Sequence, residues 1–406
     1  KKLEVKDYIE YSGHGLYGVI NGKEILFGNK KLMEKYDVDT AEYVDNTITL
    51  AVDKQIVGYI TLKEEWSENE ENILDNLKEA GVKDVAILTG DNKKAAKNIA
   101  DKLKISQVYA ELLPQEKLNK VKELQADKNK VTFLGDGIND SPVLARADIG
   151  IAMGRKGTDV AKNAADMILN DDNFVTIVDA VKQGRNIFDN IKKAIHFLIA
   201  TNIGEIVTIF VGLLLGVKSP LLAVQLLWVN LVTDSLPAIA LGLEPPEKDI
   251  MNRPPRDSRK SIFADGLMGK IVVEGFMIGM FTILAFFIGN RYYGIEVART
   301  MAFISLGMLE LIHSFNVKSE ESIFKVGLFE NKYLVGAFLL GTVLQLGIVF
   351  VPTLAEIFKL TQLNTTQWLI TIAISIAPII IVELQKKFNE LKFGKVVYDY
   401  KTRQEV

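Results

Sequence analysis

The amino-acid sequence predicts an α/β part with a parallel sheet, followed by an all-α bundle of six transmembrane helices and preceded by antiparallel strands. Composition changes sharply along the 406 residues: residues 1–193 are rich in Lys, Glu, Asp and Asn, whereas most of 194–384 is apolar. Six apolar stretches reach the roughly 20 residues that a helix needs to cross a bilayer. Before them, strand-like and helix-like segments alternate, as in parallel sheets with helical crossovers.

Residues 1–60 differ from the rest of the polar part. Short apolar runs alternate with turns, and this pattern predicts antiparallel hairpins. The runs are Gly18–Ile20, Glu24–Phe27, Thr47–Val52 and Ile56–Ile60.

Residues 61–172 carry the parallel sheet. The expected strands and helices are, in order, Val85–Thr89, Lys93–Leu103, Pro114–Ala126, Val131–Leu134 and Ile149–Met153. Because the carboxyl ends of parallel strands meet at one edge of a sheet, the loops after two of these strands could face one crevice.

A polar helix over 173–193 leads into the membrane part like a stalk. The six predicted spans are 194–216, 221–243, 267–289, 297–315, 333–351 and 367–384. Basic residues concentrate in the loops 244–265 and 316–332 and in the tail 385–406, and the opposite loops hold few. The positive-inside rule therefore predicts that both termini are cytoplasmic, together with residues 1–193.

Overall composition excludes several classes of protein. A length of 406 residues allows two or three domains. The net charge of −3 argues against a broad nucleic-acid-binding surface, so no nucleic-acid partner is expected. With no cysteine, the chain has no disulfide and no thiolate metal site. The start, Lys1–Asp7, has no apolar core and is not a signal peptide.

The segment Val131–Asp140 carries the strongest sign of chemistry. The strand-like run Val131–Leu134 is followed by a glycine-containing loop that holds Asp136, Asn139 and Asp140. Two carboxylates and an amide suit Mg²⁺ beside a phosphoryl group. The alternative is a turn with a capped helix, since Asn and Asp favour both.

A second loop, Thr89-Gly90-Asp91-Asn92, also follows a strand. Its hydroxyl and the backbone N–H groups at a helix start can hold a phosphate, although a plain strand–helix turn fits as well. Lys117, on the intervening helix, could offer a point charge to a phosphoryl oxygen or could simply be solvated.

Ionisable groups inside spans are costly and mark functional candidates. Asn202 and Glu205 share one face of the first span, and three polar residues share a face of the second: Asn230, Thr233 and Asp234. Pro237 follows and would free nearby backbone carbonyls. These oxygen ligands suit a hard cation such as Ca²⁺. Interhelical hydrogen bonding is the alternative, but it does not easily explain two carboxylates.

Four ordered segments resemble the phosphorylation domain of P-type cation-transporting ATPases, which has a haloacid-dehalogenase-like fold. They are Leu88–Asn92, Ala110–Lys117, Gly135–Asp140 and Ala147–Gly154. The resemblance implies that Thr89 binds the phosphoryl group in a loop shaped by Gly90 and Asp91. It implies that Lys117 stabilises the phosphoryl charge and that Asp136 ligates Mg²⁺. Asn139 and Asp140 would order the site.

The membrane part resembles calcium-type pumps of the same family, on Asn202–Glu205 and Pro220–Asp234. The resemblance implies that the transported cation is held by Asn202, Glu205, Asn230, Thr233, Asp234 and, in the fourth span, Glu310. Near the N-terminus, Gly13, Gly15 and Gly28 resemble the glycine-rich end of the ATP-binding domain in the heavy-metal branch of the family. Residues 1–60 would then be the C-terminal part of that domain.

The chain departs from the family pattern in lacking Asp-Lys-Thr-Gly, which carries the phosphorylated aspartate, as well as the actuator domain and the first four helices. It is therefore expected to be the C-terminal half of a Ca²⁺ pump, in the cell membrane, that forms no aspartyl-phosphate without its missing half. Two alternatives stand beside this: a noncatalytic membrane remnant or subunit that binds nucleotide or Mg²⁺, and a Zn²⁺/Cd²⁺ exporter.

Three histidines remain, His14, His196 and His313. None has a partner at metal-ligand spacing in the sequence, so a structural role is expected for each. Glu274 and Glu383 lie near predicted span ends and are expected at the interface with water.

Overall fold

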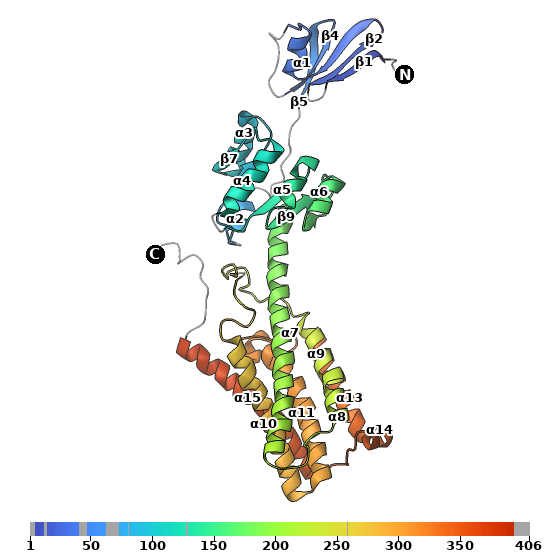
Figure 1. Ribbon diagram of the computed structural model, residues 1–406, viewed down its shortest axis with the longest axis vertical. Helices are drawn as coiled ribbons and strands as arrows, with labels where there is room; N and C mark the ends of the chain where they lie inside the picture. The colour runs from blue at the N-terminus through green and yellow to red at the C-terminus, as the bar shows by residue number, and fades with distance from the viewer. Residues whose placement is uncertain are drawn as a thin grey trace. The chain divides into compact units, whose positions relative to one another are not determined.

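The computed structural model describes residues 5–11, 14–39, 47–61, 73–79, 81–126, 129–257 and 259–393 (Figure 1). The chain divides into two compact units, Lys1–Glu71 and Asn72–Val406. Each unit is described by itself.

The first unit is an antiparallel sheet whose strands follow one another in chain order. Its strands are β1 (Val5–Tyr11), β2 (Gly15–Ile20), β3 (Lys23–Gly28), β4 (Thr47–Val52) and β5 (Gln55–Thr61). Helix α1 (Lys30–Lys35) begins after Asn29, whose side chain accepts a hydrogen bond from the Leu32 amide. Leu32 and Met33 pack with Leu26 and Ala51 in the hydrophobic core of this first unit. The antiparallel prediction for this region is confirmed.

The second unit begins with the α/β part, whose strands all pair in parallel, as predicted. The described strands form two sheets, one of β6 (Ala86–Leu88) and β7 (Gln107–Tyr109), the other in the order β10 (Met167–Leu169), β9 (Ile149–Met153), β8 (Thr132–Gly135). The helices are α2 (Ile73–Glu79), α3 (Lys93–Leu103), α4 (Pro114–Ala126), α5 (Ser141–Leu144) and α6 (Asp159–Ala164), with a 3₁₀ turn, η2 (Ile138–Asp140), before α5.

One hydrophobic core joins these two sheets. Phe133 of β8 and Val121 of α4 are buried in it, and Leu88 of β6 packs against the same cluster. Helix α4 thus contributes to a core that both sheets share, although in the described residues β6 pairs with β7 and β8 pairs with β9. The carboxyl ends of β6 and β8 carry the two predicted phosphate loops.

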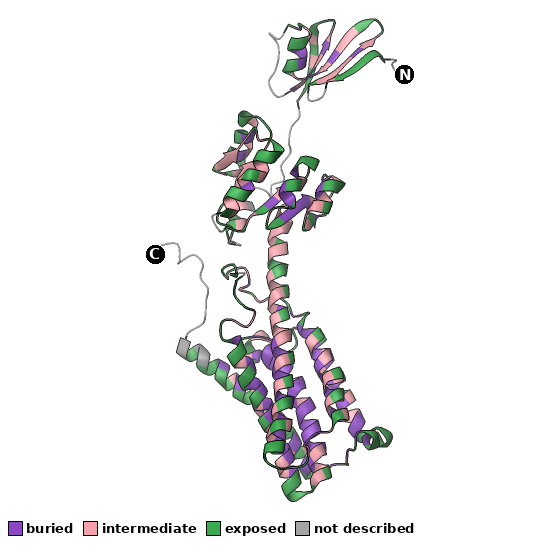
Figure 2. Cartoon of the chain, viewed as in Figure 1, coloured by how far each residue is buried: buried purple, intermediate pink, exposed green. Residues whose placement is uncertain are grey.

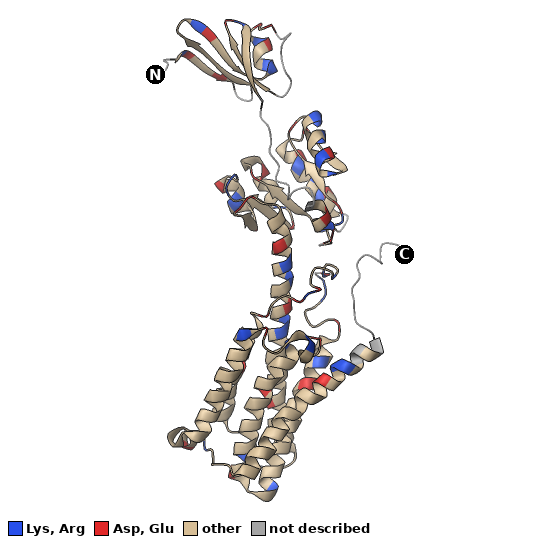
Figure 3. Ribbon diagram, turned by 180° about the vertical axis from the view of Figure 1, so that it is seen from behind, with Lys and Arg blue, Asp and Glu red and all other residues tan. Residues whose placement is uncertain are grey.

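The predicted stalk and first span are one continuous helix, α7 (Val175–Leu214). Its 40 residues correspond to about 60 Å at 1.5 Å per residue. Charged residues occupy the stalk half of α7, whereas they are sparse in the helical bundle (Figure 3).

Five helical stretches in the described residues are long and apolar enough to cross a membrane. They are α7, the stretch Ala223–Leu241, α10 (Leu267–Tyr292), α13 (Lys332–Phe350) and Thr365–Phe388 of α15 (Thr365–Phe393). The second stretch is interrupted: α8 (Ala223–Trp228) passes through a π-helical turn, η3 (Val229–Asp234), into α9 (Ser235–Leu241). Two short helices, α12 (Ile323–Val326) and α14 (Pro352–Ile357), lie in the connections.

The sixth predicted span, 297–315, forms helix α11 (Ile295–Val317), which is not one of those five. Nearly every side chain from Thr300 onward is buried, and buried residues are concentrated inside the bundle (Figure 2). Because neighbouring helices cover α11, it can carry polar residues that a lipid-facing helix could not. Exposed apolar residues such as Ile206 and Phe210 lie instead on α7.

Candidate functional site

The loop after β8 turns one carboxylate inward and leaves another exposed. Asp140 is 8% exposed, and its Oδ1 accepts from Lys117 Nζ at 2.8 Å. Its Oδ2 accepts from the Gly137 amide at 3.4 Å. Asp136 and Asn139 are exposed at the end of the strand. The structure therefore brings Lys117 of α4 to this loop, as a partner of Asp140.

Gly135 makes this close packing feasible. A Cβ atom at this position would lie 2.7 Å from Asp140 Cβ, closer than real Cβ atoms approach. The backbone at Asp136 is also fixed, because its carbonyl oxygen accepts from the Thr158 amide at 2.9 Å, at the start of α6. The exposed carboxylate of Asp136 is thus presented from a rigid loop. One free carboxylate beside an amide is a donor set that Mg²⁺ accepts, with water and phosphate oxygens completing its shell.

A second carboxylate ties β8 to the start of β9. Asp148 accepts from Lys130 Nζ at 2.7 Å, from the Val131 amide at 3.0 Å and from Gln125 at 3.0 Å. The Lys130 ammonium, the Val131 amide and Gln125 together lower the pKa of Asp148 to about 2. This anchor holds the strand that presents Asp136.

The Thr89 loop at the end of β6 is also held by hydrogen bonds among its own residues. Thr89 Oγ1 donates to Asp91 Oδ2 at 2.8 Å, and the Asp91 amide donates to Thr89 Oγ1 at 3.1 Å. Asn92 caps α3 by accepting from the Ala95 amide at 2.8 Å. Gly90 is exposed. Because β6 and β8 belong to different sheets among the described residues, the single predicted crevice is flanked by two separate strand ends.

The membrane part gathers three buried carboxylates from three segments. Glu205 lies on α7, Asp234 in η3 and Glu310 on α11, and they are 8%, 1% and 0% exposed. Asn230 Nδ2 donates to Glu205 Oε1 at 2.6 Å, and Thr233 Oγ1 lies 3.5 Å from Glu310 Oε2. We call these five residues the oxygen cluster.

Two oxygens of the oxygen cluster are buried without a hydrogen-bond partner, Asp234 Oδ1 and Glu310 Oε1. Buried polar atoms are normally paired, so such orphans need an explanation. A cation held between the carboxylates would satisfy both atoms. Carboxylate, amide and hydroxyl oxygens from three segments are the donor types that Ca²⁺ takes.

The π-helical turn η3 shapes this cluster. It carries Asn230, Thr233 and Asp234, and π turns recur at functional sites in helices. Pro237 follows in α9 and has no N–H to donate to the turn before it. At the end of the same turn, Ser235 Oγ donates to the Asn230 carbonyl oxygen at 3.2 Å.

One predicted ligand lies apart from the cluster, and one residue was missed. Asn202 is exposed, and its amide donates to the Leu198 carbonyl of its own helix at 2.6 Å, so the structure does not bring it to Glu205. Thr201 is fully buried and donates from Oγ1 to Asp234 Oδ2 at 2.9 Å. A threonine one residue before the predicted face carries little signal in the sequence, because α7 also contains Thr176 and Thr208.

The glycines of the first unit have a packing explanation. Gly15 of β2 pairs with Gly28 of β3, and Cβ atoms there would lie 2.3 Å from Phe27 O and 2.2 Å from His14 O. Gly13, the third predicted nucleotide contact, lies outside the described residues.

Known protein families match both parts of the chain. Residues 218–388 match the family model of the C-terminus of cation-transporting ATPases. Residues 2–148 and 116–181 match two family models of haloacid dehalogenase-like hydrolases.

Two curated calcium-transporting ATPases match about three quarters of the chain. Calcium-transporting ATPase 1 of Bacillus cereus is 40% identical over 354 residues, which cover 76% of this chain and 40% of the relative. The calcium-transporting ATPase of Bacillus subtilis is 42% identical over 330 residues, or 74% of this chain and 37% of the relative. This chain thus spans less than half the length of these relatives.

A solved structure of a catalytic CPx-ATPase domain, CopB-B, is 32% identical, with a TM-score of 0.36 over 45% of this chain and 67% of that one. The family matches and the relatives' names agree with the fold, in which parallel strands are followed by a bundle of apolar helices. The chain thus combines a region that matches haloacid dehalogenase-like hydrolases with a following region that matches the C-terminus of cation-transporting ATPases.

Proposed function

We propose that this chain supplies the cation-binding and Mg²⁺-phosphate-binding parts of a pump that moves Ca²⁺ across a membrane with ATP hydrolysis. The observation that carries the proposal is the oxygen cluster, in which two carboxylate oxygens are buried without a partner. Leaving such atoms unpaired in a membrane is costly, and a bound cation would remove that cost. Relatives named calcium-transporting ATPases support Ca²⁺ as the ion.

The donor chemistry favours Ca²⁺ over Zn²⁺ or Cd²⁺ at the oxygen cluster. The ligand atoms that its side chains offer a cation are carboxylate, amide and hydroxyl oxygens, and the chain has no cysteine. Soft cations select thiolate and imidazole ligands, whereas Ca²⁺ selects oxygens. Glu205, Asn230, Thr233, Asp234 and Glu310 would therefore hold the transported ion, with Thr201 orienting Asp234.

The phosphoryl group would be transferred to an aspartate that residues 1–406 do not contain in an Asp-Lys-Thr-Gly setting. We infer that a partner segment brings this aspartate on a strand that pairs with β6 and β8. Each of these two strands has a neighbour on one side only in the described sheets, and both contribute to one core. A strand between them would end beside Thr89 and Asp136.

In that arrangement the described residues divide the work of positioning and neutralising charge. Thr89 would donate its hydroxyl to a phosphoryl oxygen, and Gly90 and Asp91 would shape the loop that presents it. Asp136 would hold Mg²⁺, which neutralises phosphate charge when bound. Asn139 and Asp140 would order the loop.

In this proposal the Lys117 ammonium interacts with two groups, the Asp140 carboxylate and the bound phosphoryl group. Its ammonium is held by Asp140 at 2.8 Å, which places a positive charge at the loop that carries Asp136. A phosphoryl group bound there would share that charge. Residues 1–60, with Gly13, Gly15 and Gly28, would contact ATP.

The remaining assignments concern the domain boundaries and the orientation of the chain in the membrane. Residues 61–172 would be the phosphorylation domain, 173–193 the stalk, 194–384 the membrane domain and 385–406 a cytoplasmic tail. Basic loops on one side favour an orientation with both termini cytoplasmic, in the cell membrane. The absent partner would supply the actuator domain and four further helices.

The direct test joins this chain to the N-terminal part of the Bacillus subtilis relative and measures Ca²⁺-dependent ATP hydrolysis. We expect Asp136→Asn and Asp234→Asn each to abolish it, while Glu356→Gln, an exposed carboxylate outside both sites, leaves it unchanged. Undiminished turnover in either variant would overturn the role given to that residue. Activation by Zn²⁺ instead of Ca²⁺ would favour a heavy-metal exporter.

A noncatalytic remnant is the competing function. It predicts that the joined protein hydrolyses no ATP although it binds nucleotide or Mg²⁺. Formation of a phosphoenzyme in the joined protein, dependent on Asp136, would exclude it.

A further inference from the structure

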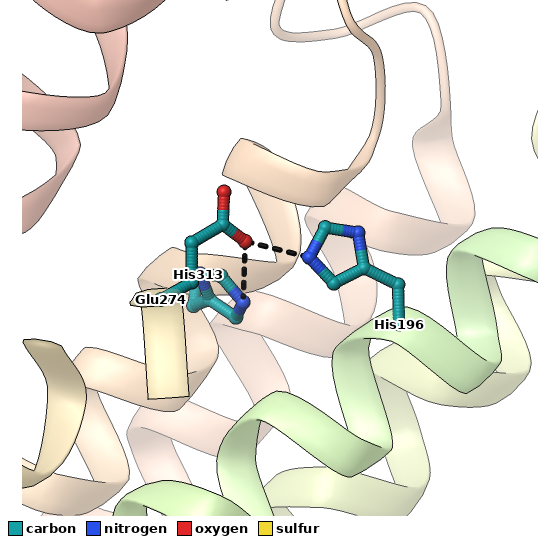
Figure 4. Close-up of side chains that lie close together, drawn as sticks. All are labelled: His196, Glu274 and His313. Carbon is teal, nitrogen blue, oxygen red and sulfur yellow. Dashed lines mark hydrogen bonds and ion pairs between the residues drawn. The ribbon is translucent and has the colours of Figure 1, made fainter. Parts of the chain in front are cut away.

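Three side chains that no proposed step uses meet inside the membrane bundle. His196 comes from α7, Glu274 from α10 and His313 from α11, and each is at most 3% exposed (Figure 4). His196 Nε2 lies 2.6 Å from Glu274 Oε2, and His313 Nε2 lies 3.6 Å from the same oxygen. One ligand atom from each residue lies within 4.8 Å of the other two.

This arrangement corrects one sequence expectation, because Glu274 is buried rather than interfacial. His196 and His313, which have no partner at metal-ligand spacing in the sequence, lie close enough to Glu274 to share a metal ion with it. Spacing along the chain concealed the cluster, because His196 and Glu274 are 78 residues apart and each member sits on a different helix.

His313 is the member of this group whose ring nitrogens lack hydrogen-bond partners. Both of its ring nitrogens are buried without a hydrogen-bond partner. One face of the ring stacks on Phe197, at 6.1 Å between ring centroids. A buried imidazole with neither nitrogen hydrogen-bonded is unusual, since such groups are normally satisfied. Its Nε2 points toward the carboxylate that already binds His196 (Figure 4).

The nearby lysines, Lys270 and Lys386, interact with groups other than Glu274. Lys270 Nζ pairs with Glu320 Oε2 at 2.8 Å. Lys386 Nζ donates to the carbonyl oxygens of Asn316 and Glu321, at 2.9 and 3.3 Å. No ammonium in the described ion pairs therefore satisfies Glu274, which leaves its carboxylate to the two imidazoles.

We propose that His196, Glu274 and His313 form a binding site for one divalent transition-metal ion of the zinc class. Two imidazole nitrogens and one carboxylate oxygen are a donor set that Zn²⁺ takes, with water in a remaining position. Ligand bonds of about 2.0–2.1 Å in a tetrahedron put the ligand atoms roughly 3.3 Å apart. The observed separations lie on both sides of that value, so small side-chain rotations complete the site.

The site is chemically distinct from the oxygen cluster. Imidazole selects zinc-class ions, whereas the oxygen cluster has no imidazole donor. The two sites nevertheless share helices: α7 carries both His196 and Glu205, and α11 carries both Glu310 and His313. An ion at the His-Glu-His site would tie α7, α10 and α11 together beside the transported cation. It is thus a site at which a trace metal would restrain the helices that bind Ca²⁺.

Zinc binding to the purified full chain in detergent micelles tests the proposal. A calorimetric titration with Zn²⁺ alone is expected to show that one Zn²⁺ ion binds per chain with high affinity. Co²⁺ alone is expected to give the visible absorption bands of a low-symmetry, four-coordinate ion. His313→Gln should weaken Zn²⁺ binding by roughly 100-fold or more, since removal of even an outer-shell partner costs 10–100-fold. The ring nitrogens of His313 make no hydrogen bond, so the variant is expected to fold.

Two matched controls separate this site from others. His14→Gln changes the third histidine, which is exposed in the first unit, and should retain the Zn²⁺ equivalent. Glu310→Gln alters the oxygen cluster and should also retain it. The melting temperature of each variant without metal identifies any loss of folding. Absence of a Zn²⁺ equivalent in the wild-type chain, unchanged binding in His313→Gln, or loss in Glu310→Gln would each overturn the proposal.

Discussion

The contact between α7 and α10 gives a quantitative prediction, because it depends on glycines next to the oxygen cluster. Gly279 of α10 lies against Gly204 of α7, the residue before Glu205. A Cβ atom on Gly279 would lie 2.7 Å from the Gly204 carbonyl oxygen and 2.7 Å from Val207 Cβ. Ordinary contact begins at 3.4 Å, and backbone atoms cannot rotate away. The variant Gly279→Ala therefore forces the two helices apart by several tenths of an ångström.

The cost of this displacement follows from overpacking. One extra methyl group in a well-packed interior typically costs about 1–3 kcal/mol. Small residues allow close approach of membrane helices, so lost packing along the whole α7–α10 contact adds to the local clash. We expect Gly279→Ala to lower the free energy of unfolding by about 1–3 kcal/mol and, by moving α7, to weaken Ca²⁺ binding at Glu205.

Gly336→Ala on α13 is the matched control, since nothing lies within 4 Å of its added Cβ atom. Alanine is a better helix former than glycine, so this variant should be neutral or slightly stabilised. Unfolding of both variants is measured in the same detergent by circular dichroism, with Ca²⁺ binding by calorimetry. Equal stabilities for the two variants would refute the claim that glycines set the distance between α7 and α10.

Two further predictions concern the α/β part. Lys117→Met removes the close cation partner of Asp140 and should destabilise this part by about 1–3 kcal/mol in a denaturant unfolding assay. Lys120→Met, whose partner Glu123 is exposed, should have a smaller effect in the same assay. A smaller effect for Lys117→Met than for Lys120→Met would contradict the proposed loop anchor. Asp148 has a folded-state pKa of about 2, below its ordinary value, so its contribution to stability is present above about pH 4 and disappears as pH falls toward 2. Asp148→Asn should flatten that part of the stability-versus-pH curve, and an unchanged slope would show that the Lys130 and Val131 contacts do not hold the carboxylate ionised.

Local patterns were sufficient to predict most of the architecture. Strand–loop–helix signals located β6, β8 and their loops, and hydropathy located five membrane-crossing stretches. The span at 297–315 was also found as a helix, yet its buried position could not be predicted, because hydropathy reports composition and not which helix the others surround. The separation of β6 from β8 was missed for a similar reason, since strand order depends on partners distant in sequence.

The candidate sites show the same limit. Spacing of three and four residues placed Asn230, Thr233 and Asp234 together, but η3 is a π turn, so ideal α-helical spacing describes it only approximately. The same rule put Asn202 beside Glu205, whereas the structure turns its amide to Leu198. The His-Glu-His site joins three helices, and no local spacing can reveal such a cluster.

Calcium binding by the full chain tests the central claim most directly. The purified protein in detergent micelles is dialysed to equilibrium with radioactive Ca²⁺, beside Glu310→Gln, Asp234→Asn and the exposed control Glu356→Gln. The oxygen cluster predicts saturable binding in the wild type and the control, reduced at least about tenfold when one buried carboxylate is neutralised, because one lost charge-assisted ligand exceeds 1.4 kcal/mol. Absence of saturable Ca²⁺ binding, equal binding in all four proteins, or Zn²⁺ preferred over Ca²⁺ and lost in Glu205→Gln would contradict the account.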